Sequence, residues 1–553
     1  AAMTIDLENT GLMRLERGAM QNWSDVARMG APASAAVREV VANLVDAGDR
    51  VLVVGPTALD LVTELADLAG ALTVLTRSIP DGATYAEALV DRPTAQVVCG
   101  DILNVEQKLG EYDVVLVLDD LARVPSLEDV TPTWTAVFEA VVACVAPGGR
   151  LALAVENELG LHRITSLRSR YTQNDDAAWD VLATFDASRP RHRDALDAAL
   201  ATTELREVSV ADLLPTWDEH TLLAWNTMSI DDEGRTLLDA LTLASPALRR
   251  IGADPTRVTR AAVLGGRLAQ MPSGWFVVAG RPVAASGELE VLASTLDGGV
   301  IRFECAAGTI RQGDRQIAIA ARARPFAEEA LDACASGDAS RLRTLLARWV
   351  GWARGQAREG RLDAEVGDLR FDNLLVALAR DDDHAFTTVA PAPASSRLDD
   401  ALWAAVVDFV AVIRARGSLH LWPAATDDRT MAATIGAMAG LAAPDDLDAL
   451  LAQRASMLDL PAHDVSGLLA VIERLEEKNK ALASRANWFE SRLNLREREL
   501  RSRAQRQSAE LALARQQQEA LRKSAEDLRR SMTYRLGNVA MGPLKQAKRR
   551  FLD

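Results

Sequence analysis

Between residues 37 and 227, short apolar runs alternate with stretches whose apolar positions recur at the helical period. This pattern predicts buried parallel strands separated by helices. The predicted strands cover residues 50–55, 71–75, 95–99, 112–118 and 150–155. Strands that alternate with helices indicate an α/β, doubly wound, Rossmann-like sheet, and such sheets bind ligands beyond the carboxyl ends of their strands.

The pattern changes after about residue 230. Short strands at 275–278, 300–303 and 317–320 are followed by helices at 341–352 and 402–413. This order predicts a separate α+β unit. The expected organisation is an N-terminal extension at 1–36, an α/β domain at 37–230, an α+β domain at 231–462, a coiled coil at 463–530 and a tail at 531–553.

A heptad repeat begins near residue 465. Its two apolar rows are Leu468, Leu475, Leu482 and Phe489, and Ile472, Asn479, Ala486 and Leu493. The rows predict a coiled coil through which the chain self-associates, whereas a single solvated helix would not need them. Asn479 at a core position favours a dimer, while the spacing of Arg485 and Glu490 is typical of parallel trimers. Both stoichiometries stay open.

The last 23 residues combine basic and apolar side chains. Five basic residues stand against one acid, Asp553, and the apolar positions include Leu536, Val539 and Phe551. Such a segment is suited to an anionic membrane surface, where each basic residue contributes about 1 kcal/mol. The alternative is a solvated tail. Because an oligomer presents several tails together, weak binding would be multiplied, and we favour the membrane.

Composition narrows the classes of function. The chain of 553 residues has a formal net charge of -16, which argues against a general nucleic-acid binder. Its four cysteines form no CxxC pair, so neither a zinc site nor a disulfide framework is indicated. No apolar stretch reaches the roughly 18 residues that a membrane span needs. We expect a cytoplasmic protein that is peripheral to the inner face of the cell membrane.

Candidate cofactor residues follow the predicted strands. The loop after the first strand reads Gly55-Pro-Thr-Ala-Leu-Asp60, which lacks the GxGxxG dinucleotide fingerprint. Asp101 follows the third strand by two residues, and Val145-Ala-Pro-Gly-Gly-Arg150 precedes the fifth. With this order of elements, residues 37–227 resemble class I methyltransferases. The resemblance implies S-adenosylmethionine as cofactor, with Gly55 and Asp101 in its binding set and Asp119 and Asp120 near the acceptor.

Two departures from the methyltransferase pattern concern the same site. The first strand has Val53 where an acidic residue is usual, and the second ends in Thr76-Arg77-Ser78 where a carboxylate should hold the ribose hydroxyls. An arginine has no acceptor atom for a hydroxyl. We therefore expect an eroded cofactor site.

A second motif lies in the α+β region. Gly367-Asp-Leu-Arg-Phe-Asp-Asn-Leu-Leu375 resembles a protein-kinase catalytic loop, which implies Asp368 as base and Asn373 as magnesium ligand. The next strand leads into Ala390-Pro-Ala-Pro393 without a metal-binding Asp, and no lysine occurs between residues 108 and 478. Arg302 is the candidate to replace the lysine that pairs with the phosphates in active kinases. Because the metal-binding Asp and the phosphate-pairing lysine are both missing, the unit is interpreted as a pseudokinase.

The order of the parts along the whole chain also resembles that of a known family. Further similar segments are Glu156-Asn157, Gly160-Leu161, 192–200 and 213–218. They resemble the bifunctional methyltransferase and kinase chain terminators of bacterial O-antigen mannan synthesis, in which a coiled coil and a basic tail follow in the same order. The resemblance implies a scaffold or chain-length regulator of surface-polysaccharide assembly, partnered by a glycosyltransferase or an active paralogue. The alternative is an active S-adenosylmethionine-dependent methyltransferase that caps a glycan terminus.

Overall fold

The computed structural model divides the chain into two compact units, residues 1–462 and 463–553. The residues that it describes are 12–21, 24–26, 34–126, 132–165, 186–227, 230–245, 259, 261–262, 265–267, 270–282, 288–295, 298–306, 309–320, 323–377, 386–415, 421–422, 426–457, 465–533, 535–537 and 539–542.

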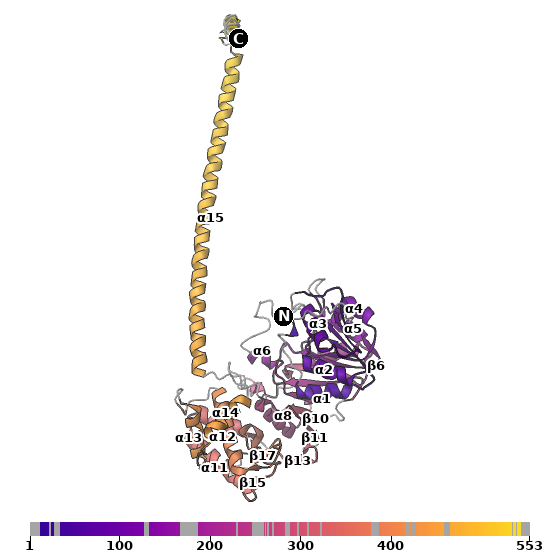
Figure 1. Ribbon diagram of the computed structural model, residues 1–553. Coiled ribbons are helices and arrows are strands. Elements are labelled where there is room, and N and C mark those ends of the chain that lie inside the picture. The colour runs from indigo at the N-terminus through magenta and orange to yellow at the C-terminus, as the bar shows by residue number, and fades with distance from the viewer. Residues whose placement is uncertain are drawn as a thin grey trace. The chain divides into compact units, whose positions relative to one another are not determined.

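A 13-stranded mixed sheet forms the centre of the first unit (Figure 1). Its parallel part has the order β4-β3-β2-β5-β6. The bounds are β2 Arg50–Val54, β3 Ala71–Thr76, β4 Ala95–Cys99, β5 Tyr112–Val117 and β6 Val145–Glu156. The strand order reverses between β2 and β5, which is the switch point of a doubly wound sheet. The predicted Rossmann-like sheet is confirmed.

Helices cover both faces of this parallel part. The first set is α1 (Ala35–Leu44), α2 (Leu59–Leu68) and α3 (Ile79–Ala88), and the second is α4 (Ile102–Leu109), α5 (Trp134–Ala143) and α7 (Arg193–Ala201). Val51 and Val53 of β2 pack with the first set, whereas Leu52 and Val54 pack with the second. Burial on both faces explains why the strands are apolar at successive positions.

The sheet continues beyond residue 230, where we expected the first domain to end. The further strands are β7 (Ser209–Leu214), β8 (Leu222–Trp225), β9 (Gly274–Ala279), β10 (Leu289–Ser294), β11 (Val300–Ala306), β12 (Thr309–Gln312) and β13 (Arg315–Ile317). The fully buried β9 lies antiparallel between β6 and β7, and β10 continues the sheet from β8. The residues on either side of 230 therefore share one sheet.

One strand also comes from the predicted N-terminal extension. β1 (Met13–Leu15) pairs in parallel with β4 at the other edge of the sheet. Three residues are too few for a recognisable alternation of apolar and polar positions. The extension is therefore part of the sheet, although its sequence did not indicate a strand.

The remainder of the first unit is mainly helical. Its helices are α8 (Asp232–Ala244), α10 (Phe326–Ala335), α11 (Ala339–Gln356), α12 (Leu398–Ala415), α13 (Asp428–Met438) and α14 (Leu447–Met457). Short strands β14 (Arg324–Pro325), β16 (Leu374–Val376) and β17 (Phe386–Thr388) form a small sheet, and β15 (Arg361–Leu362) pairs with β18 (Ser396–Arg397).

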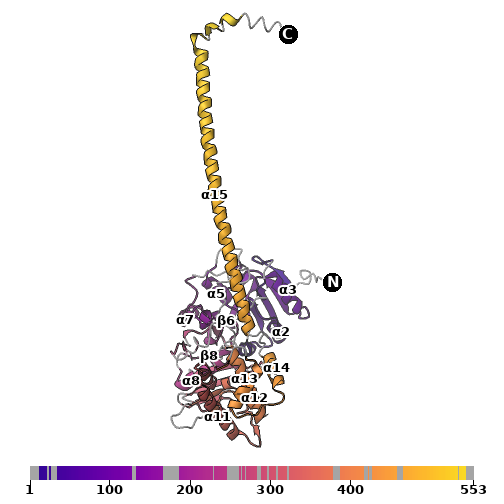
Figure 2. The ribbon, with the colours of Figure 1, turned by 90° about the vertical axis from the view of Figure 1, so that its left-hand side faces the viewer.

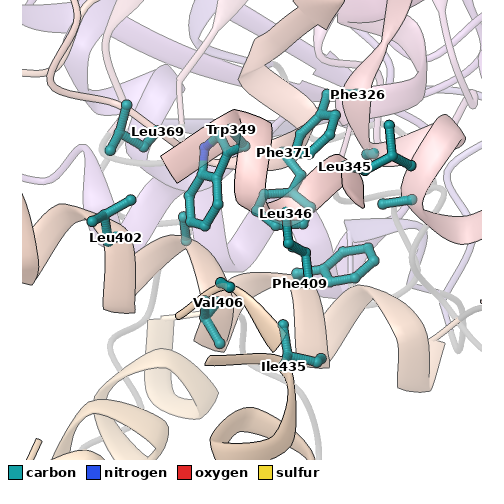
Figure 3. Packing of buried hydrophobic residues seen from close by; sticks show 14 of the residues in the cluster. Phe326, Leu345, Leu346, Trp349, Leu369, Phe371, Leu402, Val406, Phe409 and Ile435 are labelled. Carbon is teal, nitrogen blue, oxygen red and sulfur yellow. The ribbon is translucent and has the colours of Figure 1, made fainter. Parts of the chain in front are cut away.

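An aromatic cluster fixes the loop at residues 367–375, which is called the kinase-like loop for its sequence resemblance (Figure 3). Phe371, in the short 3₁₀ helix Phe371–Asn373, is buried among Phe326, Trp349 and Phe409. Its ring centroid lies 4.6, 4.9 and 4.4 Å from theirs, respectively. Aromatic pairs at such distances contribute about 0.5–1.5 kcal/mol each beyond area burial, so the loop has a rigid base.

The second unit contains α15 (Val465–Arg530), a single helix of 66 residues (Figure 2). Four of its leucines, Leu493, Leu500, Leu521 and Leu528, are exposed and keep the seven-residue spacing of the row that contains Ile472. The coiled coil itself stays a prediction, because only one chain is present. Within the described residues, no helix is long and apolar enough to cross a membrane.

Candidate functional site

The carboxyl edge of the parallel strands brings the predicted cofactor residues together. Gly55 directly follows β2 with a φ of +81°, a conformation that favours glycine. A β-carbon at this position would lie 3.3 Å from Cγ2 of Val124. The segment after β5 therefore packs closely onto the turn where the methionine end of the cofactor is expected.

Both carboxylate oxygens of Asp101 accept hydrogen bonds from the backbone at this edge. Its Oδ1 accepts a hydrogen bond from the Leu103 amide at 2.9 Å, and its Oδ2 accepts one from the Ser126 amide at 2.7 Å. A β-carbon at Gly18 would lie 2.7 Å from Cβ of Asp101, so the N-terminal chain packs directly against this residue. The carboxylate expected to bind adenine is only 2% exposed and holds two chain segments together.

Arg77 occupies the position where a ribose-binding carboxylate is expected. Its Nε and Nη2 each donate to a carboxylate oxygen of Asp25 at 2.8 Å, and its Nη1 donates to the Pro125 carbonyl at 2.9 Å. The side chains of Arg77 and Asp25 are 1% and 3% exposed. This bidentate pair is buried beside the end of β3, and sequence reasoning missed Asp25.

Residues 16–21 and 24–26 run over the ends of β3 and β4. The Glu16 amide donates to the Cys99 carbonyl at 2.8 Å, and the Met20 amide donates to the Arg77 carbonyl at 2.7 Å. Asp81 accepts hydrogen bonds from the Ser24 hydroxyl at 2.5 Å and the Asp25 amide at 2.6 Å. With Arg77 and Asp101 engaged in this way, the residues at this edge do not fit the S-adenosylmethionine that the resemblance implies.

The two aspartates after β5 are also paired. Asp119 lies 3.1 Å from Nη1 of Arg123, and Asp120 lies 2.6 Å from Nη2 of Arg189. Asp120 is fully buried and has a φ of +58°, which is uncommon for a residue other than glycine. Buried ion pairs therefore also occupy the part of the edge where the resemblance implies that the methyl acceptor binds.

The kinase-like loop places the Asn373 side chain against the backbone of Asp368. The Asp368 carboxylate accepts hydrogen bonds from Nε and Nη2 of Arg370 at 3.0 and 2.8 Å. The Asn373 side-chain nitrogen donates to the carbonyls of Asp368 and Ala390 at 3.0 and 2.8 Å, and its oxygen accepts from the Ala390 amide at 2.8 Å. Asn373 thus clamps the loop to residue 390, and its oxygen is engaged by the backbone.

Arg302 does not take the place of the missing lysine, and that interpretation was wrong. It lies on β11, whose residues Val300, Ile301 and Phe303 line a cavity, but Arg302 itself is not part of that lining. Arg302 instead forms an ion pair with Glu290 and lies 3.6 Å from Glu39 of α1.

The cavity beside Ile301 and Phe303 has a volume of about 840 Å³. One side is formed by α8 and residues of β8, β10 and β11, and the other by the kinase-like loop, residues 389–396, α12 and α14. Sequence reasoning missed it, because its walls come from segments more than 200 residues apart. Among the described residues, no group of three or more His, Cys, Asp or Glu side chains could hold a metal ion.

Comparisons with known proteins give matches of structure only. No protein-family model matches the chain, and no curated protein does. A methyltransferase from Archaeoglobus fulgidus matches with 13% identity and a TM-score of 0.26 over 44% of this chain and 93% of that one. Phosphoethanolamine N-methyltransferase 2 from Haemonchus contortus, in complex with S-adenosyl-L-methionine, matches with 13% identity and a TM-score of 0.26 over 44% of this chain and 51% of that one.

Precorrin-8w decarboxylase from Methanobacterium thermoautotrophicum is also similar, with 13% identity and a TM-score of 0.22 over 35% of this chain and 83% of that one. The chain spans about half the length of the Haemonchus protein. TM-scores of this size carry no argument, so the fold assignment depends on the strand order. By that order, the parallel part of the first unit has a Rossmann-like fold.

Proposed function

We propose that the protein is a non-catalytic, oligomeric scaffold of bacterial surface-polysaccharide assembly. In this proposal its methyltransferase-like and kinase-like parts are kept for their shape. The observation that carries the proposal is the buried pair of Arg77 and Asp25 at the end of β3. The polysaccharide context is supported by the order of the chain's parts, which resembles that of the O-antigen chain terminators.

The buried pair opposes cofactor binding in two ways. A guanidinium cannot accept hydrogen bonds from ribose hydroxyls. Separating a buried ion pair costs about 3–5 kcal/mol, which a cofactor would have to offset before it gained any contact. Residues 16–21 and 24–26, which include Asp25, would also have to leave the strand ends.

The kinase-like part lacks the groups that phosphoryl transfer requires. Transfer depends on positioned metal ions and positive charge around the phosphates. Asp368 is paired with Arg370, Asn373 is engaged by the backbone, and Arg302 is paired with Glu290 outside the cavity lining. These contacts support a pseudokinase.

Self-association is proposed to run through α15. Leucines on one row of the heptad are solvent-exposed in the single chain, and burying each would contribute about 1.5–3 kcal/mol. The row continues from Leu493 through Leu500 to Leu521 and Leu528. A second or third copy of the same helix, in register, would cover it.

The C-terminal segment is proposed to bind an anionic membrane. Met532, Leu536 and Val539 are exposed, and the basic cluster at 545–550 lies outside the described residues. Flotation of the full chain with vesicles of phosphatidylglycerol, and its absence with phosphatidylcholine, is the expected result. Equal flotation with both lipids would contradict an electrostatic anchor.

Calorimetric titration with S-adenosylmethionine tests the loss of cofactor binding. We expect no saturable binding at micromolar concentrations. Stoichiometric binding that is lost in Asp101→Ala, together with methyl transfer to a glycan end, would establish the active methyltransferase instead. The Asp60→Ala variant, which changes an exposed carboxylate of α2, is the matched control for this substitution.

Sedimentation of two matched double variants tests the coiled coil. Leu493→Asp with Leu500→Asp changes the proposed seam, whereas Leu511→Asp with Leu513→Asp changes two equally exposed leucines outside both rows. We expect the first variant to be monomeric and the second to keep the mass of the wild-type oligomer. A monomeric wild type, or equal loss in both variants, would refute the proposed seam.

A further inference from the structure

The cavity beside β11 has the size of a small-molecule site. Its volume of about 840 Å³ lies within the roughly 300–1,000 Å³ that is typical of such sites. The scaffold function proposed above assigns it no role. The chemistry of its walls decides which class of molecule it can hold.

The two sides of the cavity share one apolar core. Phe303 of β11 and Leu237 of α8 belong to the same cluster of buried residues as Val389, which comes from the opposite side. All three are at most 2% exposed. Walls that are joined through a close-packed core cannot move apart or collapse without disrupting it, so the cavity is preformed.

One wall presents no amide donor to the cavity. It consists of residues 389–393, Val-Ala-Pro-Ala-Pro, all of which belong to the lining. The amides of the first two donate to the backbone carbonyl and the side-chain oxygen of Asn373, at 2.9 and 2.8 Å. The Ala392 amide donates to the Ala364 carbonyl at 2.8 Å, and the two prolines have no N–H group. Every amide of this fully described wall is therefore engaged or missing, and its side chains are all apolar.

Further contacts hold this wall in place. Nη1 of Arg315 donates to the Val389 carbonyl at 3.2 Å, and its Nη2 donates to the Thr388 carbonyl at 2.8 Å. A β-carbon at Gly367, which also lines the cavity, would lie 3.1 Å from Cβ of Ala392, so the kinase-like loop packs closely against the wall. The wall cannot turn its amides toward a ligand without breaking these contacts.

The other walls add mainly aliphatic side chains. Those from β8, α8, β11 and α12 include Leu222, Leu241, Ala244, Ile301, Ala404 and Val407. The charged residues that the kinase-like loop contributes are paired with one another. Nη2 of Arg370 lies 2.8 Å from Oδ2 of Asp368, and its Nη1 lies 3.9 Å from Oδ1 of Asp372. On α12, Asp400 and Asp408 stand at the two ends of the lining stretch.

From these observations we infer that the cavity binds an uncharged small molecule with a rigid, apolar ring system. Burial of apolar surface needs no directional partner, whereas a phosphate or carboxylate buried without hydrogen-bond donors is costly. At residues 389–393 a ligand meets apolar side chains and amides that are already engaged. Because the cavity is preformed, a rigid ligand binds with the least loss of conformational freedom.

Fluorescence titration of the full-length protein with N-phenyl-1-naphthylamine tests the inference. This uncharged dye emits strongly only in apolar surroundings. We expect one saturable site per chain, with a dissociation constant on the order of micromolar. The anion 8-anilinonaphthalene-1-sulfonate has the same rings and should bind at least about tenfold more weakly, because residues 389–393 offer its sulfonate no donor. No saturable binding of the uncharged dye, or equal or tighter binding of the anion, would overturn the inference.

Competition with magnesium ATP distinguishes this site from a nucleotide site. Millimolar magnesium ATP should leave the bound dye in place, since the wall at residues 389–393 offers the phosphates neither amide donors nor a metal-binding carboxylate. Displacement of the dye would identify a nucleotide pocket and refute the proposed ligand class.

Two substitutions on opposing walls locate the dye. Ala404→Phe on α12 and Ala244→Phe on α8 each add a ring at a lining position that is not fully buried, and each should weaken dye binding at least about tenfold. Ala347→Phe, at an exposed position of α11 outside the lining, is the matched control and should leave the affinity unchanged.

Either lining variant decides the test if the other fails to fold, because the two lie on different walls. Unchanged dye affinity in a folded Ala404→Phe or Ala244→Phe would place the dye elsewhere. An equal loss of affinity in Ala347→Phe would likewise refute the site.

Discussion

Loop segments close the carboxyl edge of the parallel sheet, whereas the cavity beside β11 is open. At the edge, residues 16–21, 24–26 and 121–126 fill the space through the ion pair of Arg77 and Asp25 and through the hydrogen bonds of Asp101. At the cavity, Asn373 and Arg370 hold the loop in place while the space stays open. The ends of strands can be covered by loop segments. A cavity whose walls include strands and helices is harder to fill, because those walls are held in place by the surrounding core.

Removing Asp25 should have the largest effect on the closed edge. Asp25→Ala leaves the guanidinium of Arg77 buried without its carboxylate, and we expect the free energy of unfolding to fall by about 3–5 kcal/mol. Chemical denaturation of the full chain measures this loss. Asp60→Ala, which removes an exposed partner of Arg38, should cost no more than about 1 kcal/mol. Equal losses in the two variants would show that the edge is not held by its buried pair.

The next largest effect concerns the clamp beside the cavity. In Asn373→Asp the side chain can no longer donate to the Asp368 and Ala390 carbonyls, and unfolding should become easier by about 1–3 kcal/mol. The loss should be the same with and without magnesium in the denaturation series. Stabilisation by millimolar magnesium that is equal or larger in the variant, whose new carboxylate is a stronger magnesium ligand, would instead indicate a metal site at this position.

A pH series examines β7, which lies in the sheet between the two regions. Burial raises the pKa of Asp212 to about 7. Between pH 4 and 7 the unfolded carboxylate therefore releases its proton while the folded one retains it, so stability falls as the pH rises, by at most about 1.4 kcal/mol per pH unit.

The Asp212→Asn variant isolates this effect. Relative to the variant, the wild type should lose stability from pH 5 to pH 7, with no further change above pH 8. Burial lowers the pKa of His220 to about 4, which gives the opposite slope between pH 4 and 6.5 but is common to both proteins. A difference that does not vary with pH would contradict the raised pKa.

The smallest effect is expected at Arg302. Because this side chain is 39% exposed, its pair with Glu290 should contribute no more than about 1 kcal/mol, and Arg302→Ala should be correspondingly mild in denaturation. A loss as large as that of Asp25→Ala would contradict a pair that solvent screens.

The sequence predicts the parallel sheet well because both faces of each strand are buried, as in β2 and β5. It also places Gly55 and Asp101 at the correct edge, since both follow strands directly. Asp25 could not be found in this way, because its partner Arg77 is 52 residues away and neither belongs to a motif. The position of β9 depends on pairing with two distant strands, which periodicity alone does not reveal.

The insertion of β9 between β6 and β7 has a practical consequence for anyone who divides this chain. A fragment that stops near residue 230 would leave the facing sides of β6 and β7 without their neighbour, and bare strand edges invite pairing with other molecules. Such a fragment is expected to precipitate rather than behave as a free-standing domain. Cuts are better made after residue 462, where the sheet and its helices are already complete.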